Sequence, residues 1–517
     1  MKKISIYLDE KKIFILILVL AIFSSFFMLG KVPGGINQDE AYAGYEAYSM
    51  LHYGTDSHGY TNPVYLVTWG SGMSVLYSYL SIPFIALLGL NSLSVRLVEA
   101  IFSIVLVIFL YKLVKRVNGE TCALWVMFIL AIVPWRILMS RWGIDCNLAP
   151  AFLVMAWYFM VRVVDDNRFI ILAFVFYGLS LYCYATLWIL VPIMLALQMI
   201  YLILNHKIKL NIYFVIAAIL LGLLAIPLMI FLLVQYGYIG EIKTNFISIP
   251  LLPGFRGGET GFSNIVNNFK NLIEMLYRQS DNLLWNSDGK FGIYYNISLF
   301  FIVLGGGILI WRTFSSLKKR CFDLNVFHFI NLLAIFMQGV MISDINVNKI
   351  NSIHVLMVIL IALAIEWFTM HVDIKKIKYG IALVYICLYV CFTKYYYTDY
   401  ANSIAGCFQQ NLENAITWLN ENIDKDVILV GNVNYAKYLF LTKYPTDKFV
   451  KSVNYTNYPN PWLSVSGFEG VTFESEIDVN NIEYSKAYVC SVENENMFTN
   501  TGVTIKKFGD WMVAYYE

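Results

Sequence analysis

Apolar and polar residues are arranged in long blocks along this chain. Long apolar runs recur from residue 13 to residue 396, and shorter polar segments separate them. A helix needs about 20 residues to cross a hydrocarbon core of ~30 Å. The runs therefore predict a mainly α fold, a polytopic transmembrane bundle of about eleven spans. We place the spans near residues 13–30, 93–111, 121–138, 148–164, 169–185, 187–204, 212–235, 295–311, 325–342, 352–370 and 379–396.

One further apolar stretch, 72–89, is a poor span because it carries Ser74, Ser78, Ser81 and a central Pro83 and is preceded directly by Ser71. If it does not cross, every short basic turn faces the same side as the lysine-rich N-terminus, as the positive-inside rule requires. If it crossed, all of those turns would face outward. We therefore expect 72–89 to lie at the outer surface or to be partly re-entrant. The basic residues concerned are Lys112, Lys115, Arg116, Arg162, Arg168, Lys207, Lys209, Arg312, Lys318, Lys319, Arg320, Lys375, Lys376 and Lys378.

This topology predicts two domains. A transmembrane catalytic domain covers 1–397, and an extracytoplasmic α/β domain covers 398–517. The outer face receives the loops 31–92, 139–147, 236–294 and 343–351. In the tail, 410–422 has helical periodicity, 427–430 is a buried-strand run, 434–443 is helical again, and 511–515 alternates like a strand.

Composition supports a membrane protein and gives little else. Hydrophobic residues make up 59% of the chain and charged residues 14%, with a mean hydropathy of +0.62. The net charge of +2 gives no sign of a nucleic-acid partner. Lys2 and Lys3 precede the first apolar run without a small-residue cleavage site, which predicts a retained first helix. Cys407 and Cys490 lie in the predicted outer tail. The sequence does not decide whether they form a disulfide or are two free thiols.

Two adjacent carboxylates, Asp39 and Glu40, follow the first span. Carboxylates at this depth are expensive to bury, so they are candidates for chemistry. The alternative is purely structural. Both residues begin an apparently helical run to Met50, where negative charge suits the helix dipole.

Two other outer loops supply cations. Arg141 and Asp145 lie in 139–147, and Lys349 and His354 lie at the start of the span near 352–370. Their structural alternatives are an interfacial anchor for Arg141, a snorkelling lysine and a satisfied buried histidine. Carboxylates and cations on one face suit reaction at a lipid-linked phosphate. A carboxylate can deprotonate an acceptor hydroxyl, and cations can hold a departing phosphate.

The order of these motifs resembles the GT-C glycosyltransferases over roughly residues 10–370. The closest kin are the bacterial relatives of protein O-mannosyltransferases and the aminoarabinose transferase of lipid A. The resemblance rests on Asp39-Glu40, Gly54-Thr-Asp56-Ser-His58-Gly59, Asn62-Pro63, Val95-Arg96-Leu97, and Ser140-Arg141 to Asp145.

The resemblance implies roles for individual residues. Asp39 matches the catalytic acid position of the first loop, with Glu40 beside it, and Asp145 matches a second acidic position. Arg141 and Lys349 match basic positions near the donor phosphate, and we add His354 to them. Asp145, Asp56 and His58 are expected to contact substrate. His354 departs from the family pattern, in which many relatives have a more apolar residue.

The expected activity is transfer of a sugar from a polyprenyl-phosphate donor to an acceptor at the outer membrane face, by inverting displacement. The sugar and the acceptor, which could be a glycan, a lipid or a protein, stay open. A divalent metal ion is also open, with Asp39, Glu40 and Asp145 as candidate ligands. A flippase of lipid-linked glycans and a glycan polymerase or ligase are the rivals. Many transporters consist of two related halves, and this sequence shows no such repeat, which argues against a transporter.

Overall fold

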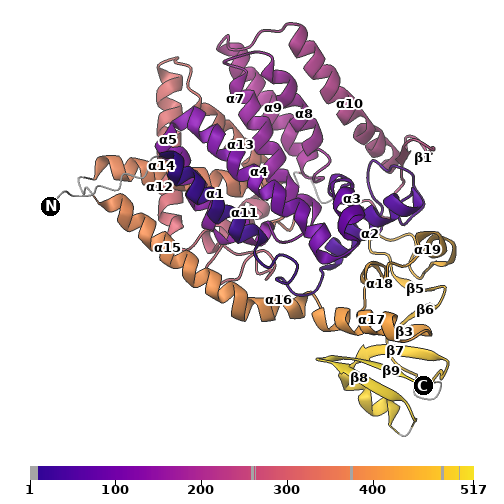
Figure 1. Ribbon diagram of the computed structural model, residues 1–517. Helices are drawn as coiled ribbons and strands as arrows, with labels where there is room; N and C mark the ends of the chain where they lie inside the picture. Colours follow the sequence, from indigo (N-terminus) through magenta and orange to yellow (C-terminus); the bar gives the residue numbers. More distant parts are fainter. Residues whose placement is uncertain are drawn as a thin grey trace.

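The computed structural model describes residues 10–257, 261, 264–372, 376–478, 482–499 and 501–516. Lys2, Lys3 and Lys375, which entered the topology argument, lie outside these residues. The chain forms a large helical part followed by a smaller part that contains a sheet (Figure 1). The predicted mainly α class with a C-terminal α/β region is confirmed.

A helix forms at each predicted span. The helices are α1 (Glu10–Phe26), α4 (Ser92–Asn118), α5 (Glu120–Ile132), α7 (Ala149–Arg162), α8 (Phe169–Ser180), α9 (Leu187–Leu204), α10 (Ile212–Gln235), α12 (Ser298–Lys318), α13 (Asn325–Met341), α14 (Ile353–His371) and α15 (Ile377–Tyr395). Among the described residues, 6 helices are long and apolar enough to cross a membrane: α4, α9, α10, α12, α14 and the helix that begins with α15. The total of eleven spans stays a prediction.

The segment predicted as one span over 121–138 is divided by a proline. Helix α5 ends at Ile132, Val133 is extended, and α6 (Pro134–Met139) starts with the proline at its first position. Proline lacks the backbone N–H that a continuous helix would need and disfavours helical geometry in the residue before it. The break turns α6 toward the loop that carries Arg141 and Asp145.

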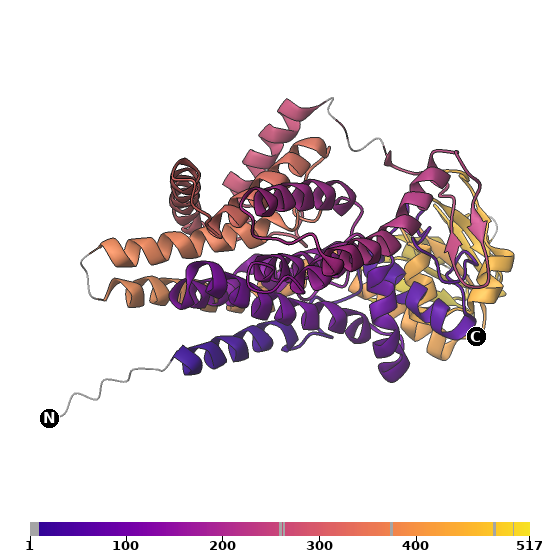
Figure 2. The same cartoon turned by 90° about the horizontal axis from the view of Figure 1, so that it is seen from above.

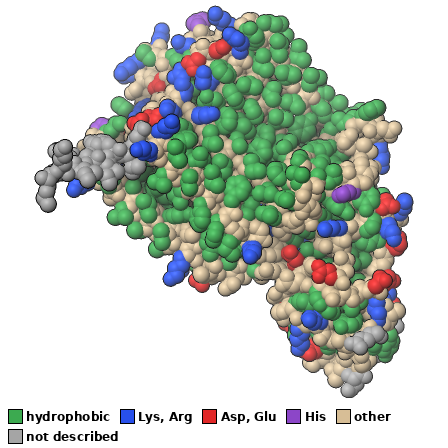
Figure 3. Space-filling view, in the orientation of Figure 1, with side chains coloured by type: hydrophobic (Ala, Val, Ile, Leu, Met, Phe, Trp, Pro, Cys, Tyr) green, Lys and Arg blue, Asp and Glu red, His purple; other side chains and the backbone are tan. Residues whose placement is uncertain are grey.

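Polar contacts tie the basic turns together at one end of the bundle. Arg116 in the last turn of α4 and Arg162 at the end of α7 both pair with Asp165, at 2.5 and 3.0 Å. The side chain of Asn167 donates to the carbonyl of Lys209, at 3.0 Å, which links the α7–α8 and α9–α10 turns. Between the charged edges, hydrophobic side chains cover the visible face of the helices (Figure 3). This pattern is typical of a protein surrounded by lipid.

The opposite end of the bundle carries the remaining short elements. These are α2 (Gln38–Tyr53), α3 (Leu76–Leu88), α11 (Ile265–Arg278), and the small antiparallel pair β1 (Ile242–Lys243) and β2 (Ser248–Ile249). The stretch 72–89 does form a helix, with Pro83 inside it. Its position relative to a membrane stays a prediction.

The last long helix runs past the predicted domain boundary at 397/398. Helix α15 continues through a π-helical turn, Tyr396–Tyr400, into α16 (Ala401–Cys407). The tail then forms α17 (Gln410–Asn422), α18 (Tyr435–Thr442) and α19 (Thr446–Ser452). The predicted helices at 410–422 and 434–443 agree with α17 and α18.

The tail contains a mixed sheet of seven strands in the order β4-β5-β6-β3-β7-β9-β8. The central strand β3 (Asp426–Val430) is parallel to β6 (Val471–Glu474) and β7 (Lys486–Ser491), whereas the outer pairings are antiparallel. The others are β4 (Asn454–Tyr455), β5 (Val465–Phe468), β8 (Thr504–Phe508) and β9 (Trp511–Tyr515). The strands predicted at 427–430 and 511–515 are both present.

The tail packs against the end of the bundle that carries α2 (Figure 2). A Cβ at Gly44 of α2 would lie only 2.7 Å from the ring of Phe440 of α18, so the glycine permits this approach. The hydroxyl of Tyr45 donates to the carbonyl of Tyr444 at 2.8 Å. The segment 31–92, predicted to be the first outer loop, therefore shares an interface with the C-terminal domain.

Candidate active site

The first turn of α2 positions the two predicted carboxylates. Asn37 caps the helix: its side chain accepts the N–H of Asp39 at 2.9 Å, and Glu40 accepts the N–H of Asn37 at 3.1 Å. This reciprocal arrangement satisfies N–H groups that would otherwise lack a partner. Successive helical residues point about 100° apart, so Asp39 and Glu40 face different surroundings.

Glu40 is completely buried and fully engaged. Arg96 donates to both of its oxygens, at 2.8 and 2.9 Å, and the N–H of Gly143 donates at 2.8 Å. The same guanidinium also donates to the carbonyl of Pro33 at 2.7 Å. Glu40 therefore joins α2, α4 and the loop after α6. These contacts favour the structural alternative for Glu40.

Asp39 has a different environment. It is partly exposed, and the indole Nε1 of Trp69 donates to its carboxylate at a long 3.3 Å. Burial raises the pKa of Asp39, the bond from Trp69 opposes the rise, and the neighbouring Glu40 adds to it. A carboxylate with a raised pKa and few protein partners is well suited to accept a proton from a substrate.

Asp145 lies close enough to Asp39 for the charge of Asp39 to affect it. It accepts the N–H of Ser74 at 3.0 Å and that of Cys146 at 2.7 Å. Burial raises the pKa of Asp145 to about 7, and the nearby negative charge of Asp39 contributes. The structure thus brings together the two acidic positions that the resemblance selected from separate loops.

Arg256 completes this cluster, and the sequence analysis did not select it. It lies on the long outer loop, and its charge lowers the pKa of Asp39. Its guanidinium lies 4.8 Å from the ring centroid of Trp462 in the C-terminal domain. The available signal was an arginine between Gly254 and Gly257, within a proline- and glycine-rich stretch.

Arg141 lies outside the cluster of Asp39, Asp145 and Arg256. It is completely buried and donates to the carbonyl of Val32 at 2.7 Å and to those of Ser24 and Ser25 at 3.3 and 3.2 Å. Its Nε also donates to the hydroxyl of Tyr396, at 3.0 Å. Arg141 therefore fastens the end of α1 to the last long helix, and these contacts favour an anchoring role.

Lys349 and His354 form a third location. The ammonium of Lys349 donates to the carbonyl of Ser343 at 3.0 Å. His354 is completely buried, its Nδ1 is hydrogen-bonded to the hydroxyl of Tyr294, and its ring centroid lies 5.2 Å from that of Trp135. The partners of these two side chains include neither Asp39 nor Asp145.

Asp56 and His58 belong to a second acidic cluster further along α2. Asp56 is buried and accepts the N–H groups of His58 and Tyr60, at 2.9 and 2.8 Å. Its neighbour Glu46 accepts the N–H of Ser57 at 2.7 Å. Burial raises the pKa of both carboxyls, the charge of Asp56 adds to the rise at Glu46, and burial lowers the pKa of His58 to about 4. Glu46 follows Asp39 by seven residues, roughly 10 Å along the helix, so this cluster is separate.

The three candidate metal ligands do not fit a shared metal ion. Arg96, Gly143 and Asn37 occupy the oxygens of Glu40, which leaves only Asp39 and Asp145. In the part of the chain that the structure describes, no group of three His, Cys, Asp or Glu side chains is placed to hold a metal.

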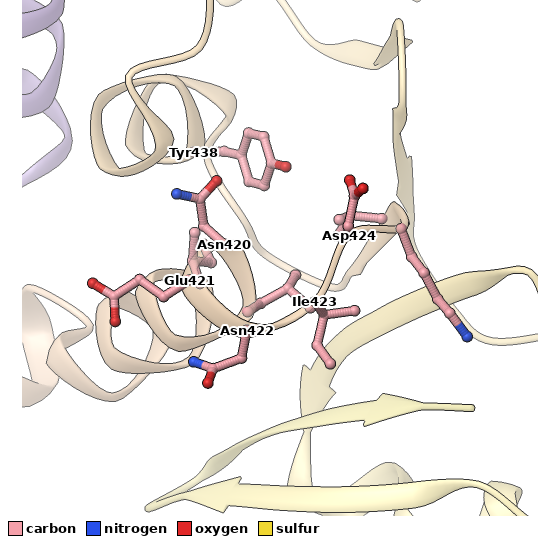
Figure 4. A pocket seen from close by; sticks show the side chains of 10 residues that line it. Asn420, Glu421, Asn422, Ile423, Asp424 and Tyr438 are labelled. Atoms are coloured by element: carbon pink, nitrogen blue, oxygen red, sulfur yellow. The ribbon is translucent and has the colours of Figure 1, made fainter. Parts of the chain in front are cut away.

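A hollow of ≈ 430 Å³ lies away from this cluster, on the C-terminal domain. The end of α17 and the turn into β3 line it, together with Tyr438 of α18. Asn420 lies beside the ring of Tyr438, whereas Glu421 and Asn422 point away from it (Figure 4). Its exposed polar rim carries none of the predicted site residues.

Comparisons with known proteins agree with the predicted resemblance. Residues 74–231 match the family described as dolichyl-phosphate-mannose-protein mannosyltransferase. No curated protein sequence matches the chain significantly.

Several solved structures share its fold. ArnT from Cupriavidus metallidurans bound to undecaprenyl phosphate superposes with a TM-score of 0.57 at 11% identity, over 97% of both chains. Its apo state gives 0.58 at 11% identity, over 98% of both chains. The Archaeoglobus fulgidus oligosaccharyltransferase in the apo form gives 0.52 at 11% identity, over 84% of this chain and 64% of that one. The predicted resemblance to GT-C glycosyltransferases is confirmed.

Proposed function

We propose that this chain is a membrane glycosyltransferase that moves a sugar from a polyprenyl-phosphate donor to an acceptor at the outer membrane face. The main observation that supports this proposal is the cluster of Asp39, Asp145 and Arg256. It places an available carboxylate and a guanidinium together at the end of the bundle where the C-terminal domain packs. The fold shared with ArnT, whose structure holds undecaprenyl phosphate, supports a lipid-linked donor.

Asp39 acts as the general base in this proposal. Its partial exposure and single long hydrogen bond leave it able to accept the proton of an acceptor hydroxyl. The acceptor oxygen attacks the anomeric carbon while the bond from that carbon to the phosphate oxygen breaks. The proton passes to Asp39, and polyprenyl phosphate departs with the bonding electrons. A single displacement of this kind inverts the anomeric configuration.

Arg256 holds the departing phosphate. A guanidinium can bind phosphate oxygens in a bidentate manner, and it stabilises the charge that develops on them. Arg141 is held by backbone carbonyls of the α1 end, so we assign it to anchoring. Lys349 is a secondary candidate on the loop beside α14.

Asp145 positions the site beside the base. Its two backbone contacts fix the 73–75 segment against the 145–146 turn. The negative charge of Asp39 contributes to the raised pKa of Asp145, because like charges disfavour each other's ionised form. We assign Glu40 and Arg96 to holding α2 in place.

The test uses the purified protein in lipid nanodiscs with a synthetic polyprenyl-phosphate sugar labelled in the sugar. Release or transfer of the label by the wild type, and its loss in Asp39→Asn, is the expected result. In cells that lack the protein, the lipid-linked monosaccharide should accumulate. Accumulation of a lipid-linked glycan on the inner leaflet, with no donor cleavage in vitro, would instead identify a flippase. Transfer of a whole glycan would identify a polymerase or ligase.

A further inference from the structure

Trp462 is an exposed tryptophan at the edge of the acidic cluster. It lies in the connection between β4 and β5 of the C-terminal domain, and 53% of it is exposed. Tryptophan is usually well buried, so such exposure beside a functional cluster is informative. Its ring centroid lies 6.4 Å from that of Trp69, the residue that donates to Asp39. The guanidinium carbon of Arg256 also lies near the ring of Trp462, 4.8 Å from its centroid.

The connection that carries Trp462 is fixed by its own amides. The side chain of Asn460 accepts the N–H of Trp462 at 2.8 Å, and that of Asn457 donates to its carbonyl at 2.7 Å. The N–H of Leu463 donates to the carbonyl of Trp69 at 2.6 Å. The backbone that carries the indole is therefore fixed by these bonds, and the ring is positioned by its contacts with Trp69 and Arg256. A preorganised connection lowers the entropic cost of binding a ligand there.

Two glycines let this connection reach the site. Gly70 has a φ of +101°, and a Cβ there would lie 2.3 Å from the carbonyl oxygen of Asn460. A Cβ at Gly254, two residues before Arg256, would lie 2.2 Å from the nitrogen of Pro461. The first outer loop and the long outer loop therefore both depend on glycine to admit the tip of the C-terminal domain.

We propose that Trp462 is a saccharide-binding platform that the C-terminal domain contributes to the active site. A pyranose or furanose ring has an apolar face of C–H groups that packs on an indole, while its hydroxyls reach the polar groups around it. Here those groups are the carboxylate of Asp39 and the guanidinium of Arg256. The assignment rests on the proposed function and specifies it, since it gives the C-terminal domain a substrate-binding role.

The ring bound on Trp462 is either the donor sugar or a sugar of the acceptor. Both have the same chemistry, so the experiment has two arms, each with the full chain in nanodiscs. The binding arm uses the Asp39→Asn background. It compares the Kd of synthetic polyprenyl-phosphate mannose and polyprenyl-phosphate aminoarabinose with that of bare polyprenyl phosphate of the same length. The transfer arm uses labelled donor and envelope vesicles from cells lacking the protein, and measures the vesicle concentration that gives half-maximal transfer.

Trp462→Ala and Trp462→Leu remove the aromatic face, whereas Trp462→Phe and Trp462→Tyr keep one. Tyr458 lies in the same connection and is 64% exposed, so Tyr458→Ala is the matched control. Gly254→Ala keeps the indole but displaces the connection, and it should act in the same direction as Trp462→Ala.

If Trp462 binds the donor sugar, Ala and Leu weaken binding of the sugar-bearing lipid about tenfold and leave bare polyprenyl phosphate unchanged. If it binds an acceptor sugar, donor binding stays constant and the half-maximal vesicle concentration rises about tenfold. Phe and Tyr should recover most of either loss. The proposal is overturned if Trp462→Ala changes neither arm, or if Leu performs as well as Phe. Absence of donor cleavage by the wild type would refute the proposed function instead, and the binding arm would still test the sugar contact.

Discussion

Asp39 and Glu40 are adjacent in the chain, and the structure predicts opposite consequences for removing their charges. Asp39→Asn should abolish transfer and leave the fold intact. Glu40→Gln should weaken the fold first. An amide cannot act as a base, so the expected loss of turnover in Asp39→Asn is at least ~10²-fold. Its structural cost is small, because Trp69, at 3.3 Å, is the one hydrogen-bond donor to this carboxylate among the described residues.

The cost of Glu40→Gln follows from its contacts. The carboxylate accepts two bonds from Arg96 and one from Gly143, all at 2.8 to 2.9 Å, with both charged side chains 0% exposed. Removing one partner of a buried ion pair leaves the other charge uncompensated, which costs about 3–5 kcal/mol. The double variant Glu40→Gln/Arg96→Gln should regain part of that stability, because no buried charge then lacks a counter-charge.

The assay measures apparent Tm in detergent and label transfer in nanodiscs for the same preparations. We expect Glu40→Gln to lower the apparent Tm by several degrees and Asp39→Asn to leave it unchanged. A stable but inactive Glu40→Gln, beside a catalytically competent Asp39→Asn, would reverse the two roles and refute the reasoning. Equal destabilisation by both would show that Asp39 is also structural.

Three other outcomes are expected. Because burial raises the pKa of Asp39, its basic form is lost as pH falls through a value above its usual range, and kcat/KM should fall there. Asp39→Asn removes the negative charge that contributes to the raised pKa of Asp145, so an infrared titration of the carboxyl should find the pKa of Asp145 lowered in that variant. Arg256→Gln should lower kcat at least ~10-fold. A larger loss in Lys349→Gln would instead identify Lys349 as the main residue that binds the donor phosphate. A cysteine placed at Asn496 in the tail should react with an impermeant thiol reagent in intact cells.

Each of these has a matched control. Lys270 lies exposed on the same long outer loop as Arg256, so Lys270→Gln tests for a general charge effect. A pKa of Asp145 that does not change in Asp39→Asn would show that the two carboxyls do not interact. Cys321 is exposed in the turn between α12 and α13, on the predicted inner side, and should react only after lysis. Reaction at Cys321 in intact cells, with protection at Asn496→Cys, would overturn the topology.

Local sequence patterns were sufficient to predict most of the helices and strands. The apolar runs located the helices of the bundle because a segment's hydrophobicity and length depend only on its own residues. The same holds for α17 and β3 in the tail, where periodicity and a buried run mark the elements. Pro134 was visible in the sequence, and its known effect accounts for the one predicted span that divides in two.

Tertiary structure decided what each polar residue does. The spacing from Asn37 to Glu40 is that of a capping box, but only the folded chain brings Arg96 and Gly143 to Glu40 and makes it the centre of a buried ion pair. The guanidinium of Arg141 likewise donates to backbone carbonyls at the end of α1, and only the folded chain brings these groups together. Arg256 and Trp462 reach Asp39 from loops that lie hundreds of residues away in the chain. Hydrophobic burial is a property of segments and can be summed along the sequence, whereas a charged group's role depends on which distant partners the folded chain brings within a few ångströms.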